Sequence, residues 1–124
     1  QEQLSGGIEM ILGYRNDPAL GPAVMIGAGG ILADLFEDVA LCVLPASPKD
    51  ICRMIESLKI TPLLNGYRGA EPVDLENLVE TIARFMHMCE SIGERLIEAE
   101  INPLFLGPTG MPPLALDGVL ALKE

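Results

Sequence analysis

The sequence predicts an α+β fold in which helices pack on one face of a mostly antiparallel β-sheet. Short apolar segments follow one another near the start of the chain, two segments with helical periodicity come next, and short apolar segments return near the end. Strands and helices are therefore grouped and do not alternate strictly, which disfavours a parallel α/β sheet. The chain has 124 residues and contains no internal repeat, so we expect residues 1–124 to form a single domain.

The first three predicted strands are short apolar segments, which span Ile8–Tyr14, Pro22–Gly27 and Val39–Leu44. Polar turn residues separate the first two strands, and Pro45 ends the third. The glycine-rich segment 27–30 suggests a phosphate-binding loop with accessible backbone amides. It lacks the spacing of a dinucleotide fingerprint, however, so a tight bend or bulge is the favoured interpretation.

Two helices are predicted next. Ser47 is the expected N-cap of the first helix, Pro48 its first residue and Pro62 its end. Asp74 is the expected N-cap of the second helix, which continues to Ile92. One apolar stripe of this second helix should face the sheet, and it contains Leu75, Leu78, Val79, Ile82, Met86 and Cys89. His87 lies on the opposite, polar face, which favours a surface histidine over a phosphohistidine.

Two strands are predicted to complete the sheet, at Leu96–Ile101 and Leu114–Leu120, joined through a turn at 107–110. Because side chains alternate along a strand, Glu98, Glu100 and Asn102 should share one face. Pro103 is expected to end the first of these strands. A hairpin would then place Asp117 opposite Asn102, so that two oxygen ligands could hold Mg²⁺. The alternative is a solvated sheet face with a turn-forming asparagine, and the pattern alone leaves both open.

Composition excludes several classes of function. The net charge of −10 argues against binding to nucleic acid or to an anionic membrane, and no apolar run reaches the roughly 18 residues of a membrane span. The odd number of cysteines, Cys42, Cys52 and Cys89, favours buried, reduced thiols in a cytoplasmic protein. Apolar residues make up 49% of the chain, which indicates a surface for a partner or for a second copy. The first residue is Gln, so we expect a piece of a longer protein.

The chain resembles a known family through several short segments that occur in the family's order. These segments are Glu9–Gly13, Asn16–Pro18, Gly21–Pro22, Gly27–Gly30, Asp38–Ala40, Asn65–Gly69, Glu100–Leu104 and Leu116–Gly118. Together they resemble the C-terminal half of the ATP-grasp domain of ADP-forming acetyl-CoA synthetases, and more distantly the β subunit of succinyl-CoA synthetase. The likeness covers almost the whole chain, and its most specific part is Glu100–Leu104 followed by Leu116–Gly118.

The resemblance implies a role for four residues. Asn102 and Asp117 match the two Mg²⁺ ligands of the family, and Glu9 matches a glutamate that binds the nucleotide. Glu100 matches a catalytic glutamate that faces the phosphohistidine during phosphate exchange with ATP or ADP. The implied reaction joins a carboxylate and CoA at the expense of ATP, through an acyl phosphate and a phosphohistidine. Cys42 stands where many relatives carry a basic residue, which is a departure from the family pattern.

The same resemblance implies partners that this chain lacks. These are the remainder of the ATP-grasp domain and the CoA-binding domain that bears the phosphohistidine, so the chain alone should be inactive. Two alternatives from other classes remain open. Related domains also occur fused to protein acetyltransferases, so the chain could be a regulatory module that senses a ligand. It could also be a structural interaction domain. Neither the acyl substrate nor the choice between ADP and GDP follows from the sequence.

Overall fold

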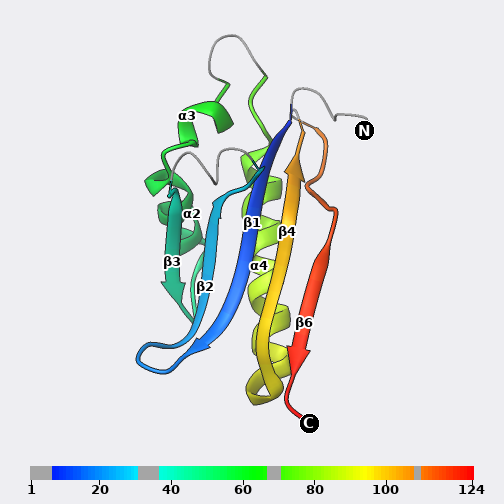
Figure 1. Cartoon of the computed structure of the whole chain (residues 1–124). Helices are drawn as coiled ribbons and strands as arrows, with labels where there is room; N and C mark the ends of the chain where they lie inside the picture. The colour runs from blue at the N-terminus through cyan, green and yellow to red at the C-terminus, as the bar shows by residue number, and fades with distance from the viewer. Residues whose placement is uncertain (1–6, 31–36, 67–70, 108–109) are drawn as a thin grey trace.

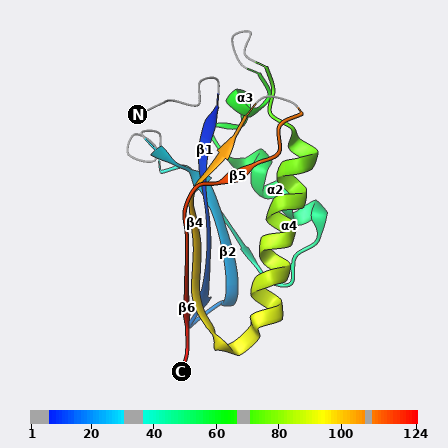
Figure 2. The same ribbon diagram turned by 90° about the vertical axis from the view of Figure 1, so that its right-hand side faces the viewer.

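The structure is a computed structural model that describes residues 7–30, 37–66, 71–107 and 110–124. Within these ranges the chain forms a six-stranded antiparallel sheet whose strands follow the order β3-β2-β1-β4-β5, with β6 also paired to β4. The strands are β1 (Ile8–Asp17), β2 (Gly21–Ala28), β3 (Val39–Val43), β4 (Leu96–Leu106), β5 (Leu114–Ala115) and β6 (Gly118–Leu122). The helices cover one face of this sheet and leave the other open (Figures 1 and 2). The predicted α+β fold is therefore confirmed.

The two predicted helices are present, with one change. Helix α2 (Pro48–Ser57) begins with a capping box, because Ser47 Oγ accepts the Asp50 N–H at 3.2 Å and Asp50 Oδ2 accepts the Ser47 N–H at 2.8 Å. The sequence suggested that Pro62 ends this helix, but the helix already ends at Ser57. Pro62 lies in the first turn of a separate short helix, α3 (Thr61–Leu64), where a missing N–H is tolerated.

Helix α4 (Leu75–Ile92) packs lengthwise on the sheet and is followed by the 3₁₀ turn η2 (Gly93–Arg95). Asp74 caps it as predicted, since Asp74 Oδ1 accepts the Asn77 N–H at 3.1 Å. Its fully buried side chains include Leu78 and Ile82 of the predicted stripe. Leu75, which the predicted stripe also placed on the sheet, is 36% exposed, because it occupies the first turn and its side chain leans past the start of the helix.

Strand β4 is longer than predicted. It continues through Pro103 to Leu106, and the Asn102–Pro103 peptide bond is cis. Pro103 has no N–H to donate, but its carbonyl oxygen accepts the Leu116 N–H at 3.0 Å, which keeps the pairing with the last strands. The pairing of β4 with β1 shifts by one residue between Met10 and Leu12, and this bulge absorbs the irregularity. The predicted final strand is divided into β5 and β6.

The surface of the described residues carries many apolar side chains, as the composition indicated. Large exposed hydrophobic residues lie mainly on the two edges of the sheet, and those on β3 and β6 are Val39, Leu41, Val43, Val119, Leu120 and Leu122. The prediction of three buried thiols is wrong for Cys52, because it lies on the solvent side of α2. Among the described residues, no helix is long and apolar enough to cross a membrane.

Candidate functional site

Glu100 and Asn102 lie on the same face of β4, as the alternation of side chains predicted. The Asn102 side chain donates a hydrogen bond from Nδ2 to Glu100 Oε2 at 3.2 Å. This contact fixes which way the amide points, because the nitrogen is turned toward the carboxylate and Oδ1 therefore lies on the other side. The amide oxygen, which is the atom that a hard metal ion would bind, is thus directed away from Glu100.

Asp117 lies opposite Asn102, at the junction of β5 and β6. The pairs Ile101–Gly118 and Leu104–Ala115 share one register, which brings residues 102 and 117 face to face. The Asn102 N–H donates to the Asp117 carbonyl oxygen at 3.1 Å. The Asp117 carboxylate accepts the Gly118 N–H through Oδ1 at 2.8 Å, which orients the side chain at the turn. The structure therefore brings together Glu100, Asn102 and Asp117.

Glu9 lies on β1 at the same end of the sheet. It pairs with Phe105, three residues beyond Asn102 on β4, which is about 10 Å along the strand. The glycine-rich segment after β2 packs against it, since the Gly29 N–H donates to the Glu9 carbonyl oxygen at 2.8 Å. Gly30 has a positive φ of 62°, and a Cβ atom there would lie 2.7 Å from Glu9 Oε1. A side chain at this position would displace the Glu9 carboxylate, and the positive φ favours glycine there.

The same contacts decide between the two interpretations of the segment 27–30. The Ala28 N–H donates to the Asp38 carbonyl oxygen at 3.0 Å, and the Gly29 N–H is used by Glu9. These amides are therefore already engaged in the structure and do not form an open anion cradle. The segment is a close-packed strand end, as the favoured interpretation held. Of the loop 65–69, residues 67–69, including Arg68, lie outside the described residues.

A groove of about 510 Å³ runs across the open face of the sheet, over β1, β2, β3 and β4. Its lining includes Gly13, Arg15, Met25, Leu41, Glu98 and Glu100. Arg15 on β1 is the register partner of Glu98 on β4. Its Nη2 atom lies 3.9 Å from Asp17 Oδ2. Reasoning from the sequence did not identify this groove, because its walls come from four strands whose order is set by the fold.

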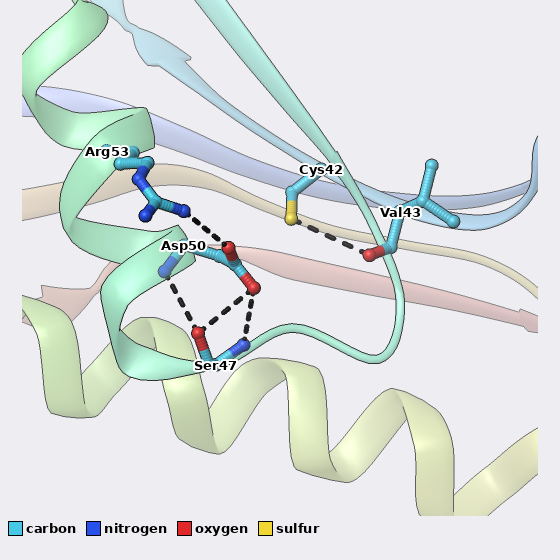
Figure 3. Close-up of polar contacts among 5 residues, drawn as sticks. All are labelled: Cys42, Val43, Ser47, Asp50 and Arg53. Atoms are coloured by element: carbon cyan, nitrogen blue, oxygen red, sulfur yellow. Dashed lines mark hydrogen bonds and ion pairs between the residues drawn. The ribbon is translucent and has the colours of Figure 1, made fainter.

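Cys42 is on β3 and faces α2 (Figure 3). Burial and the nearby Asp50 carboxylate raise the pKa of its thiol, which makes the thiolate scarce at neutral pH. The Sγ atom donates a weak hydrogen bond to the Val43 carbonyl oxygen at 3.6 Å, while Arg53 pairs with Asp50 at 3.2 Å. These contacts indicate that Cys42 is a packing residue rather than a nucleophile.

The side chains of residues 102 and 117 suit Mg²⁺. Asp117 offers a carboxylate and Asn102 an amide oxygen, and the Glu100 carboxylate lies beside Asn102. No group of three or more His, Cys, Asp or Glu side chains arranged to hold a metal occurs among the described residues. A cation at Asn102 and Asp117 would therefore need further ligands from water or from phosphate oxygens, as Mg²⁺ in nucleotide sites commonly has.

Comparison with known proteins identifies relatives over nearly the full chain. The β subunit of ADP-forming acetate–CoA ligase II from Pyrococcus furiosus is 33% identical over 120 residues, which are 97% of this chain and 51% of that protein. The ADP-forming 4-hydroxybutyrate–CoA ligase of Nitrosopumilus maritimus is 34% identical over 116 residues, or 94% of this chain and 16% of that protein. This chain thus spans about half of the first relative and a smaller part of the second.

A solved structure is similar as well. Acetyl-coenzyme A synthetase 1 of Ca. Korarchaeum cryptofilum, in complex with coenzyme A and Mg-AMPPCP, superimposes with a TM-score of 0.85 at 36% identity. The match covers 94% of this chain and 54% of that one, and in that complex the phosphohistidine segment points towards the nucleotide binding site. The family model for the ATP-grasp domain matches residues 1–122. The chain therefore belongs to the ATP-grasp domain family.

Proposed function

We propose that this chain is the C-terminal portion of the ATP-grasp domain of an ADP-forming acyl-CoA synthetase, and that it holds Mg-nucleotide. The observation that carries the proposal is the meeting of Glu100, Asn102 and Asp117 at one end of the open sheet face. It is supported by relatives that are ADP-forming ligases of acetate and of 4-hydroxybutyrate. The reaction of the complete protein would convert acyl-CoA, ADP and phosphate into carboxylate, CoA and ATP, and its reverse.

In this proposal Asn102 and Asp117 hold Mg²⁺ through Asn102 Oδ1 and the Asp117 carboxylate. The ion, when bound, would neutralise charge on the phosphate groups of ATP or ADP. The hydrogen bond from Asn102 to Glu100 keeps the amide oxygen available for this purpose. A single carboxylate binds Mg²⁺ weakly, so the nucleotide and the ion should bind together.

Glu9 and Glu100 would act on the two sides of the phosphate groups. Glu9 is held against the glycine-rich segment at the nucleotide end, where we propose that it contacts the bound nucleotide. Glu100 projects into the open groove, where it can face a phosphohistidine that approaches from another domain. A carboxylate in that position would orient the imidazole and stabilise its positive charge during phosphate transfer.

The surface of the chain supports a proposal about its partners. The open groove has Arg15 as its cation and carboxylates around it, so the positive charge that phosphates require should come from the rest of the ATP-grasp domain. We propose that this remainder and a CoA-binding phosphohistidine domain cover the open face in the complete, cytoplasmic protein. In isolation, the exposed apolar edges would favour association of the chain with itself.

The decisive experiment uses the complete protein and measures ATP formation from acyl-CoA, ADP and phosphate over a range of Mg²⁺ concentrations. Asp117→Ala should lower the rate by about 100-fold or more while the circular dichroism spectrum is unchanged. Glu76→Ala is the matched control, because it removes an exposed carboxylate from α4 on the far side of the sheet. If Asp117→Ala retains the rate of the control and its Mg²⁺ dependence, the proposed metal site is wrong.

A further inference from the structure

Asp38 is the buried charged side chain among the residues that the structure describes, with 4% of its surface exposed. It precedes β3 and belongs to none of the strands or helices. A buried carboxylate is costly unless its oxygens accept hydrogen bonds. Each oxygen here accepts one from the backbone between α2 and α3, because Lys59 N–H donates to Oδ1 at 2.5 Å and Ile60 N–H donates to Oδ2 at 2.9 Å.

The backbone of Asp38 makes a further contact, with the end of β2. Its carbonyl oxygen accepts the Ala28 N–H at 3.0 Å, at the end of β2. A Cβ atom on Gly27 would lie 2.8 Å from that same oxygen, so the two segments approach as closely as a glycine allows. One residue therefore ties the junction of α2 and α3 to the end of β2.

The end of β2 leads directly to Glu9. After Ala28, the Gly29 N–H donates to the Glu9 carbonyl oxygen, and Gly30 lies against the Glu9 carboxylate. A movement of residues 28–30 would therefore change the position of the Glu9 side chain. The chain of contacts runs from Asp38 through Ala28 and the glycines to Glu9, and each link is a hydrogen bond or a close packing contact.

We propose that Asp38 is a positioning residue for nucleotide binding. Its buried carboxylate holds the residue against the backbone between α2 and α3, its carbonyl oxygen holds the glycine-rich end of β2, and that segment sets the position of Glu9. The inference rests on the role proposed above for Glu9 as a nucleotide-binding residue. It predicts that loss of the Asp38 carboxylate weakens nucleotide binding selectively. The sites of CoA and of the acyl group, which we place on other domains, should be unaffected.

The test compares variants of the complete protein by steady-state kinetics. Asp38→Asn keeps the size of the side chain but places an NH₂ group against a backbone N–H, so one of the two hydrogen bonds is lost. The KM for ADP should rise about 10- to 100-fold, as is typical when a residue that orients a ligand-binding group is replaced, while the KM for acyl-CoA stays the same. Asp74→Ala is the control, because it also removes a carboxylate that accepts a backbone N–H, on α4.

A double-mutant cycle with Glu9→Gln separates positioning from general damage. If Asp38 acts through Glu9, Asp38→Asn should raise the KM for ADP much less in the Glu9→Gln background. Additive effects, or equal changes in the KM for ADP and for acyl-CoA, would overturn the inference. If Asp38→Asn does not fold, Gly27→Ala takes its place, because its Cβ would lie 2.8 Å from the Asp38 carbonyl oxygen and would push Asp38 away from the end of β2; an unchanged KM for ADP would then overturn the inference.

The cycle also distinguishes this inference from the proposed function. An unchanged KM for ADP in Glu9→Gln would remove the role of Glu9 and, with it, the positioning role of Asp38. A raised KM in Glu9→Gln together with an unaffected Asp38→Asn would leave the role of Glu9 intact and would refute the positioning role alone.

Discussion

Cys89 should resist alkylation far more strongly than the other thiols as long as α4 stays packed on the sheet. Its side chain is 1% exposed, and burial, together with the nearby Glu90, raises its pKa from 9.0 to about 11. At pH 8 a thiol with a pKa of 9 is about one-tenth thiolate, whereas one with a pKa of 11 is about one-thousandth thiolate. The raised pKa alone therefore slows the reaction about 100-fold, and burial slows it further.

The assay is alkylation with iodoacetamide at pH 8, followed by digestion and mass spectrometry of the cysteine-containing peptides at successive times. Cys52, which is exposed on α2, should be modified first and Cys89 last. In a denaturing concentration of urea the rates should come within a few-fold of each other, because both the burial and the raised pKa disappear. A Cys52→Ser variant confirms the assignment of the fast phase. Modification of Cys89 as fast as Cys52 in native buffer would refute the packing of α4.

Three further predictions concern stability and association. As pH rises from about 9 to 11, the free energy of unfolding should fall by about 2 to 3 kcal/mol. The unfolded chain releases the Cys89 proton near the lower pH, whereas the folded chain holds it to the higher one. In urea titrations, Cys89→Ala should reduce this dependence of the unfolding free energy on pH. Ile82→Ala should destabilise the chain by about 2 to 5 kcal/mol, whereas His87→Ala on the exposed face should change stability by less than about 0.5 kcal/mol. Light scattering should show self-association of the isolated chain, and Leu41→Glu should reduce it if the edge strand β3 is responsible.

Much of the fold could be predicted because local signals and the final structure agree. Helix α4 is the clearest case, since an N-cap at Asp74 and an apolar stripe with helical spacing both mark it. The alternation in β4 placed Glu100 and Asn102 on one face, and their hydrogen bond confirms it. The end of β4 could not be predicted. Some prolines stop a strand, whereas others are accommodated within it by a bulge and a cis peptide bond, as Pro103 is, and the two cases look the same in the sequence.

The candidate site was only partly predictable, for a related reason. Glu100, Asn102 and Asp117 lie within one antiparallel pairing, so spacing along the sequence was enough to bring them together. Asp38 contacts residues that are 21 and 22 positions away, and no periodicity links them. One signal was available, namely the acidic pair Glu37–Asp38 directly before an apolar strand. Its meaning depends on burial, which only the packed structure supplies.

The hydrogen bond between Asn102 and Glu100 changes how loss of Glu100 should be interpreted. Truncation to alanine would remove the carboxylate that faces the groove and would also release the Asn102 amide, which could then turn its nitrogen toward the metal position. Loss of activity in Glu100→Ala would therefore mix a catalytic effect with a weaker metal site. Glu100→Gln keeps an acceptor oxygen for the amide and removes the charge alone. If Glu100 acts on the phosphohistidine, Glu100→Gln should slow phosphate transfer while the Mg²⁺ concentration for half-maximal rate stays unchanged; a shift of that concentration alone would assign Glu100 to the metal site instead.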